Sequence, residues 1–165
     1  MLQPNKNAGF TLYELMVTVT VAAIIASFAV PGFQNLVSNN RSVTHTNDFV
    51  TALNLARSEA TRRRFPIDVC ASADGATCSG SNDWSTGWIV RTPAGQVLQA
   101  WPARSGGAGV LSGNVSNIQF QASGSLPAGA NPLISLQLPR CKDPGRRNIT
   151  ISPAGRIAVT RVACT

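Results

Sequence analysis

The sequence predicts an α+β fold: one long N-terminal helix, with its hydrophobic half projecting, packed on an antiparallel β-sheet headpiece. Three observations point to this fold. A nearly uncharged apolar segment occupies residues 10–30, an amphipathic helical pattern follows to about residue 64, and short apolar stretches separated by turn residues make up the remainder. A chain of 165 residues has room for one modest domain plus the projecting segment.

The apolar segment holds a single charged residue, Glu14, and its other side chains would make a helix apolar on nearly every face. About 20 such residues cross the hydrocarbon core of a bilayer, so we expect the segment to anchor the chain in a membrane. A lone carboxylate there is costly without a partner, which indicates a functional role for Glu14. We expect one helix from Phe10 to about Arg64, with a kink or local break at Pro31-Gly32 because proline removes a backbone donor.

Beyond Pro31 the helix is expected to carry one apolar stripe that packs against a sheet. The stripe recurs at helical spacing, at Phe33, Leu36, Val37, Val43, Val50, Leu53, Ala56 and Ala60. The solvated face is expected to hold Asn39, Asn40, Arg41, Asn47, Arg57 and Arg63. Glu59 and Arg63 stand four residues apart in the favourable order for an ion pair, and Pro66 ends the helix.

Short strands are expected after the helix. They cover residues 65–70, 87–91, 96–101, 118–121, 133–138, 148–151 and 156–162. Two hairpin turns, Thr92–Gly95 and Ser152–Gly155, share Pro at the second position and Gly at the fourth, which suits a type I turn. The Gly-rich residues 105–113 are expected to form a loop. Trp84, Trp88 and Trp101 are expected to be core residues, with an interface or stacking role as the alternative.

The positive charge belongs to the headpiece. From Arg41 onward the chain has 13 basic and 6 acidic residues, and all but one of the basic residues are arginine. Guanidinium groups suit bidentate phosphate binding, so the bias favours a polyanionic partner, with general solubility as the alternative. The run Arg62–Arg64 has two interpretations, a solvated helix end or a phosphate-binding patch for DNA or lipid head groups.

The cysteine count is even, which suggests disulfides if the headpiece faces an oxidising compartment. The four cysteines allow three pairings. We prefer Cys70–Cys78, which closes a short local loop, with Cys141–Cys164, which would pin the C-terminus. Each bridge is expected to contribute ~2–4 kcal/mol.

We expect no enzymatic activity, no cofactor and no metal. The single histidine, His45, has Asp48 three residues on, which indicates a solvated pair on the helix surface. The chain has no C-x-x-C pair and no nucleotide-binding loop, and no paired carboxylates at an expected strand end.

The G-F-T-L-x-E processing motif is matched at Gly9, Phe10, Thr11, Leu12 and Glu14. With the apolar helix that follows, the chain resembles type IV pilins and the pseudopilins of type II secretion. The resemblance implies that a prepilin peptidase cuts between Gly9 and Phe10 and methylates the new amino terminus. It also implies that Glu14 neutralises the terminal amine of a neighbouring subunit. The alternative, an ordinary signal peptide or signal anchor, is disfavoured because the leader lacks a strongly basic region and an acid opens the apolar run.

The resemblance further implies a type IV pilin-like fold and its domain organisation: a leader at residues 1–9, a transmembrane and assembly half of the helix at 10–39, and a globular headpiece at 40–165. The partners implied are other pilin subunits, the prepilin peptidase and, before assembly, the bacterial inner membrane. The headpiece would lie in the periplasm at that stage and in the extracellular pilus fibre after assembly.

Two further features resemble the FimT/FimU/GspH branch of minor pilins and pseudopilins. One is Ala56-Arg57-Ser58-Glu59-Ala60 near the helix end, before a strand that closes in Cys70. The other is the Gly155-Arg156 hairpin that finishes near Cys164. The branch implies a minor pilin at or near the pilus tip that supports assembly. The alternative is a GspH-like minor pseudopilin of a type II secretion system without DNA binding.

FimT-like members bind double-stranded DNA for uptake in natural transformation through a C-terminal G-R-x-R element. Gly155 and the arginine after it match, but Ala158 replaces the second arginine. Other arginines between Cys141 and Cys164 could compensate. The DNA-binding candidates are therefore Arg146, Arg147, Arg156 and Arg161. Strand alternation places the last two on opposite faces, and binding would be to phosphate and salt-dependent.

Overall fold

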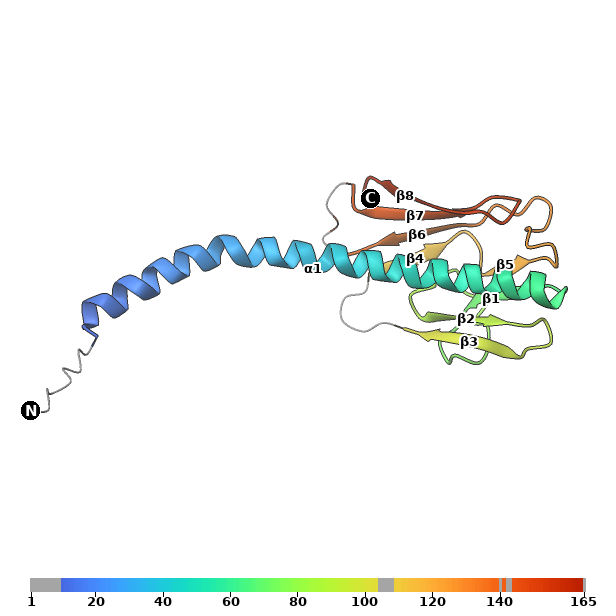
Figure 1. Ribbon diagram of the computed structural model, residues 1–165, viewed down its shortest axis with the longest axis horizontal. Coiled ribbons are helices and arrows are strands. Elements are labelled where there is room, and N and C mark those ends of the chain that lie inside the picture. Colours follow the sequence, from blue (N-terminus) through green and yellow to red (C-terminus); the bar gives the residue numbers. More distant parts are fainter. Residues whose placement is uncertain (1–9, 104–108, 140, 142–143, 165) are drawn as a thin grey trace, which may run out of the picture. The chain divides into compact units, whose positions relative to one another are not determined.

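The computed structural model describes residues 10–103, 109–139, 141 and 144–164, leaving aside the side chains of residues 30–36 and 38. Within these residues one long helix is followed by eight short strands (Figure 1). The chain divides into two compact units, Met1–Ser38 and Asn39–Thr165. The second unit, called the headpiece below, begins one residue before the predicted boundary.

Helix α1 spans Leu12–Arg63, close to the predicted bounds. It is continuous through Pro31 and Gly32, so the expected local break is absent. The loss of one backbone donor at Pro31 is tolerated because the turns on either side stay helical. The helix stops where Arg64 adopts the left-handed conformation, with φ of 58°, two residues before Pro66.

The first sheet has the order β3-β2-β1-β5 and is antiparallel throughout. Its strands are β1 (Ile67–Ala71), β2 (Gly87–Arg91), β3 (Val97–Pro102) and β5 (Asn117–Phe120). Every residue of β1 is buried, so the strand is covered on both faces. Val69 faces the core, and Cys70 is covered on the other side by the loop that its disulfide closes, in which Gly75 lies against Ala100 of β3.

The second sheet has the order β4-β6-β7-β8 and is also antiparallel. Its strands are β4 (Val110–Gly113), β6 (Leu133–Gln137), β7 (Arg146–Ile151) and β8 (Ile157–Val162). The prediction of a loop at residues 105–113 was wrong for β4. This strand is stabilised along its outer edge, where the Trp84 amide donates to the Leu111 carbonyl (2.8 Å) and the Gly113 amide to the Asn82 carbonyl (2.9 Å). The headpiece therefore contains two sheets where one was expected.

The headpiece part of α1 lies along both sheets, and the core fills the space between them (Figure 1). Phe49 on the helix meets Trp84 and Trp88 edge to face, with ring centroids 5.3 and 5.2 Å apart. Trp84 and Trp88 are buried, and Trp101 is half-buried and stacks on Trp88. The core role predicted for the tryptophans is therefore correct.

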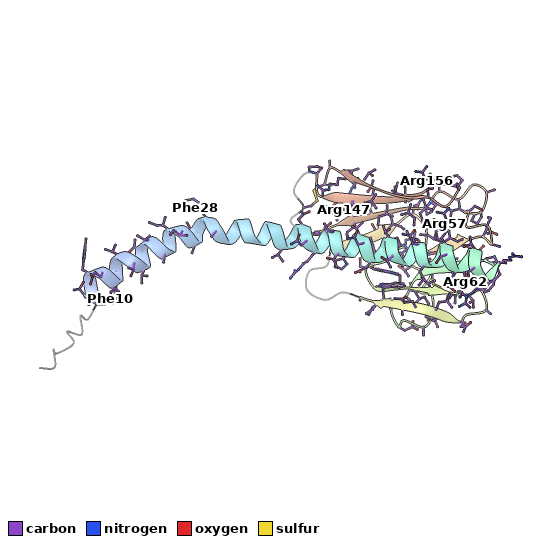
Figure 2. All side chains as sticks on the ribbon, viewed as in Figure 1. Phe10, Phe28, Arg57, Arg62, Arg147 and Arg156 are labelled. Carbon is purple, nitrogen blue, oxygen red and sulfur yellow. A yellow bond between two sulfur atoms is a disulfide. The ribbon has the colours of Figure 1, made fainter. Side chains whose placement is uncertain are left out.

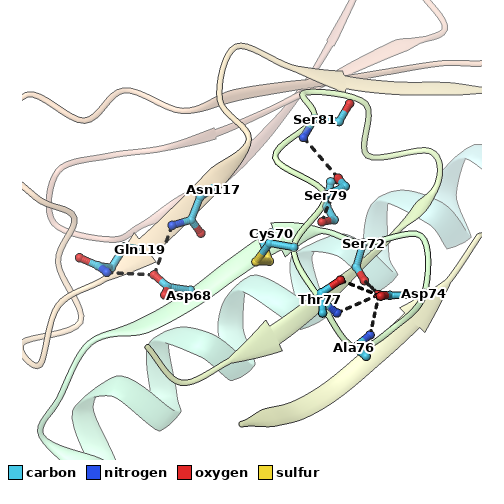
Figure 3. Close-up of a disulfide and its surroundings, with 12 residues drawn as sticks. Asp68, Cys70, Ser72, Asp74, Ala76, Thr77, Ser79, Ser81, Asn117 and Gln119 are labelled. Carbon is cyan, nitrogen blue, oxygen red and sulfur yellow. Dashed lines mark hydrogen bonds between the residues drawn. A yellow bond between two sulfur atoms is a disulfide. The ribbon is translucent and has the colours of Figure 1, made fainter. Parts of the chain in front are cut away.

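Both preferred cysteine pairs, Cys70–Cys78 and Cys141–Cys164, are bonded in the structure. The first closes a loop that is organised around the carboxylate of Asp74 (Figure 3). This carboxylate accepts hydrogen bonds from the Thr77 hydroxyl and amide, the Ala76 amide and the Ser72 hydroxyl. These donors hold the pKa of Asp74 well below its usual range. The loop therefore stays compact without a large apolar side chain of its own.

Candidate functional site

The N-terminal processing motif leads directly into the first turn of α1. Gly9 lies outside the described residues, and Phe10 is exposed. The Thr11 amide and hydroxyl both donate to Glu14 Oε2, at 2.9 and 2.8 Å, and the Glu14 amide donates back to Thr11 Oγ1 at 3.2 Å. This is a capping box, and it gives the carboxylate a partner inside its own chain. The predicted partner of Glu14 lay only in another subunit, although the Thr-x-x-Glu pattern was the signal for this bond within the chain.

The apolar half of α1 has no partner surface in the described chain. Leu12–Ala29 has a mean hydropathy of 1.9, and none of this span is buried. Its polar interruptions are satisfied locally, since the Thr18, Thr20 and Ser27 hydroxyls donate to helix carbonyls three or four residues earlier. The span is thus long and apolar enough to cross a bilayer, and its Thr18, Thr20 and Ser27 hydroxyls are paired within the helix.

The four candidate arginines do not form one patch. Figure 2 shows two of them, Arg147 and Arg156, apart from each other in the headpiece. β7 alternates between half-buried and buried residues, so Arg146 lies on the outer face of the second sheet and Arg147 on the face toward α1. Arg161 stands directly opposite Arg147 in the β7–β8 register and shares its face. Arg156 lies before β8, at the opposite end of that strand.

Arg147 is 8% exposed and ties the sheet to the start of the headpiece helix. Its Nε donates to Ser42 Oγ at 2.9 Å and one terminal nitrogen to Asn39 Oδ1 at 3.5 Å. Burial, and secondly the charge of Arg161, lower its pKa. A side chain held in this way is poorly placed to reach a DNA backbone. Arg146 instead lines a pocket of about 410 Å³ beside Gln137 and Leu138.

Arg156 is exposed, and its side chain makes no hydrogen bond or ion pair with any described residue. Its backbone amide donates to Ser152 Oγ at 3.1 Å, so the turn before it is closed. Arg57 of α1 holds this turn in place, because its Nε donates to the Gly124 carbonyl and a terminal nitrogen to the Ala154 carbonyl, both at 3.1 Å. The prediction that Arg57 is simply solvated was therefore wrong.

A glycine is required at position 155 because the backbone of Gly124 approaches it closely. The φ of Gly155 is +76°, and a Cβ there would lie 2.0 Å from the Gly124 oxygen and 3.0 Å from Arg57 Nε. The two sequence features that suggested the minor-pilin branch, the arginine after Ala56 and the Gly155-Arg156 hairpin, thus meet in one contact. No pattern within either segment indicated this.

The end of α1 reaches the same contact, since Thr61 lies against Gly124. Arg62 and Arg63 are the last two residues of α1, and Arg64 follows directly. Glu59 pairs with Arg62 at 2.6 Å and with Arg63, as predicted for the latter. Hydrogen bonds first from Arg62 and then from Arg63 lower the pKa of Glu59 to about 2. Arg62 and Arg64 are both exposed, so this end of the headpiece is positive together with Arg156.

His45 is 8% exposed and faces the headpiece interior, so the prediction of a solvated pair with Asp48 was wrong for the histidine. The predicted apolar stripe includes Val43 and Val50 but not His45, which lies between them in sequence and is buried. Among the residues that the structure describes, no group of three potential ligands could hold a metal ion.

Comparison with known proteins agrees with this architecture. Residues 45–155 match the family described as type II transport protein GspH, and residues 4–30 match the prokaryotic N-terminal methylation motif. Two crystal structures of the Pseudomonas aeruginosa type IV minor pilin FimU are similar to the chain. One is 22% identical with a TM-score of 0.59, covering 77% of this chain and 90% of that one. The other is 24% identical with a TM-score of 0.55, covering 69% and 88%.

The likeness to FimU establishes the type IV pilin-like fold, and the family match covers more than half of the sequence. The N-terminal motif, the exposed apolar helix and the helix-on-sheet headpiece all agree with it. The chain therefore belongs to the GspH family of pilin-like proteins that carry the N-terminal methylation motif.

Proposed function

We propose that the chain is a minor subunit of a bacterial type IV pilus, incorporated at or near the tip and supporting assembly. The observation that carries this proposal is the wholly exposed apolar span Leu12–Ala29, beside a headpiece that buries its own core. Such a span needs lipid before assembly and the apolar helices of other subunits afterwards. Processing between Gly9 and Phe10 would leave a methylated amine on Phe10. This amine would lie four residues before Glu14, the residue that caps the helix together with Thr11.

Glu14 is proposed to receive the amine of a neighbouring subunit. Both hydrogen bonds that Thr11 donates end on Oε2 of Glu14, which leaves Oε1 for a further donor. Glu14→Ala should reduce the amount of this chain in sheared filaments on the order of a hundredfold, because it leaves a buried amine without its counter-charge. Immunoblotting of the filament and membrane fractions from cells with the complete assembly system measures this. Ser27→Ala, in the same helix, is the control, and equal incorporation of both variants would contradict the proposal.

A second candidate is a minor pseudopilin of a type II secretion system, which the description of the matched family favours. The two candidates share the anchor and the processing, so they differ only in the assembly that fails without the chain. Deletion of the gene should abolish or shorten surface pili if the first is right. Loss of protein secretion with normal pili would establish the second.

DNA capture is proposed as an added role of the subunit, through the positive end formed by Arg62, Arg64 and Arg156. The support is the exposure of these three residues and the rigid placement of the turn before Arg156 by Arg57. Contacts of this kind would reach phosphates and carry no base readout, so binding should depend steeply on salt.

Arg156→Ala should weaken binding of the headpiece to double-stranded DNA and reduce the slope of log affinity against log salt by about 1. A fluorescence-anisotropy titration at several salt concentrations measures both quantities. Arg161→Ala removes the same charge from the other end of β8 and is the matched control. If both variants lose affinity equally, DNA binding depends on the net charge of the headpiece and not on the position of Arg156. If the unmodified headpiece binds no DNA at low salt, the role is wrong.

A further inference from the structure

Two arginines of the second sheet face each other where the headpiece begins. Arg147 and Arg161 are directly opposed in the β7–β8 register, which places their Cβ atoms about 5 Å apart. Like charges in this arrangement repel each other. Arg147 is 8% exposed, while Arg161 is exposed at the edge strand.

The described chain gives this cationic pair no anion. Arg147 donates only to the neutral oxygens of Ser42 and Asn39. Arg161 makes no hydrogen bond or ion pair with a described residue. A buried guanidinium beside a second cation is costly unless a negative charge is bound, and the lowered pKa of Arg147 reflects that cost. The pair is therefore suited to an anion from outside the described chain.

The position of the pair along the chain indicates which anion. Asn39 and Ser42 follow Ala29, the last residue of the apolar span, by ten and thirteen residues, or about 15–20 Å of helix. Residues 30–38 carry no charge, so this stretch can enter the interfacial region, and helix tilt brings the next turn closer still. Arginine side chains also extend toward lipid head groups.

We propose that Arg147 and Arg161 together bind the phosphate of an anionic phospholipid head group while the subunit waits in the membrane. Two guanidinium groups supply planar N–H donors that match phosphate oxygens. A DNA duplex fits less well, because a stiff backbone cannot reach a side chain as enclosed as Arg147. The inference rests on the membrane anchoring in the proposed function and needs neither filament position nor DNA binding.

The test uses the full chain in lipid nanodiscs of phosphatidylcholine, alone or mixed with phosphatidylglycerol. Tryptophan fluorescence reports unfolding of the headpiece only, because Trp84, Trp88 and Trp101 all lie there. The unfolding midpoint should be about 3 °C higher in the anionic discs, since a ligand that binds only the folded state stabilises it. Arg161→Gln should abolish this difference, and Arg62→Gln, which removes an exposed arginine at the far end of the headpiece helix, should preserve it.

Arg147→Met separates binding from a structural role. It should also abolish the lipid difference, yet keep a midpoint in phosphatidylcholine at least equal to that of the unmodified chain, because an uncompensated buried charge is gone. A purely structural arginine would instead make this variant less stable in both kinds of disc. That result would overturn the proposal.

Three other outcomes would also overturn it. The first is an equal unfolding midpoint of the unmodified chain in both kinds of disc. The second is a full midpoint shift when inorganic phosphate is added to phosphatidylcholine discs. The third is an unchanged midpoint difference between the two kinds of disc in Arg161→Gln. If Arg147→Met and Arg161→Gln both lose DNA affinity while Arg62→Gln keeps it, net charge is excluded as the cause and the pair serves DNA instead. Normal filament incorporation alongside any of these results would leave the proposed assembly function intact.

Discussion

Gly155→Ala should destabilise the headpiece by about 3 kcal/mol, the sum of a left-handed backbone penalty and an overpacking penalty. The added methyl would collide with the Gly124 carbonyl at 2.0 Å. Moving that carbonyl would break its bond to Arg57, so the strain cannot relax cheaply. Chemical denaturation of the headpiece, followed by tryptophan fluorescence, measures the loss.

Gly129→Ala is the matched control for this substitution. Its φ is +78°, nearly the same as that of Gly155, but a Cβ there meets nothing within 4 Å. The control should therefore cost only the backbone penalty, roughly 1–2 kcal/mol. Equal losses in the two variants would mean that the contact among Gly155, Gly124 and Arg57 contributes nothing beyond backbone conformation.

Replacing Cys141 and Cys164 together by serine should cost about 3 kcal/mol. The bridge closes 23 residues of sequence that contain β7 and β8, and its main effect is to restrict the unfolded chain. The loss should be seen as a lower denaturation midpoint under non-reducing conditions. The m-value should not fall if the folded headpiece stays intact.

The Cys70–Cys78 bridge provides the comparison, because it closes only eight residues of sequence. The corresponding double serine variant should lose less, about 2.5 kcal/mol. The hydrogen bonds to Asp74 are expected to hold much of that loop without the bridge. A larger loss here than at Cys141–Cys164 would show that loop length does not control the effect.

Most of the fold follows from local patterns. The bounds of α1, seven of the strands within one or two residues and the core tryptophans were predictable from periodicity and turn residues. β4 was not, because Val110 and Leu111 follow a Gly-rich stretch and their partners, β6 and the segment around Trp84, are distant in sequence. The split into two sheets was missed for the same reason, since strand order depends on long-range pairing.

The candidate site was only partly predictable. Alternation predicted opposite faces for Arg156 and Arg161, and the structure places Arg156 just before β8 and Arg161 near its other end. Counting charges between Cys141 and Cys164 could not show that Arg147 turns inward, although its alternation with Ile149 and Ile151 along β7 was a local signal for that face. The role of Arg57 was hidden because its acceptors are carbonyls 67 and 97 residues away, and any residue type supplies those.

The two arginines that join the helix to the second sheet have a mechanical consequence. Arg147 fastens the sheet to α1 at Ser42, and Arg57 fastens the turns at Gly124 and Ala154 four helical turns further on. A pulling force that enters through α1 is thus transmitted at two separated points and loads the interface in shear. Shear requires the intervening contacts to fail together, whereas a single fastening would let the sheet peel away one contact at a time.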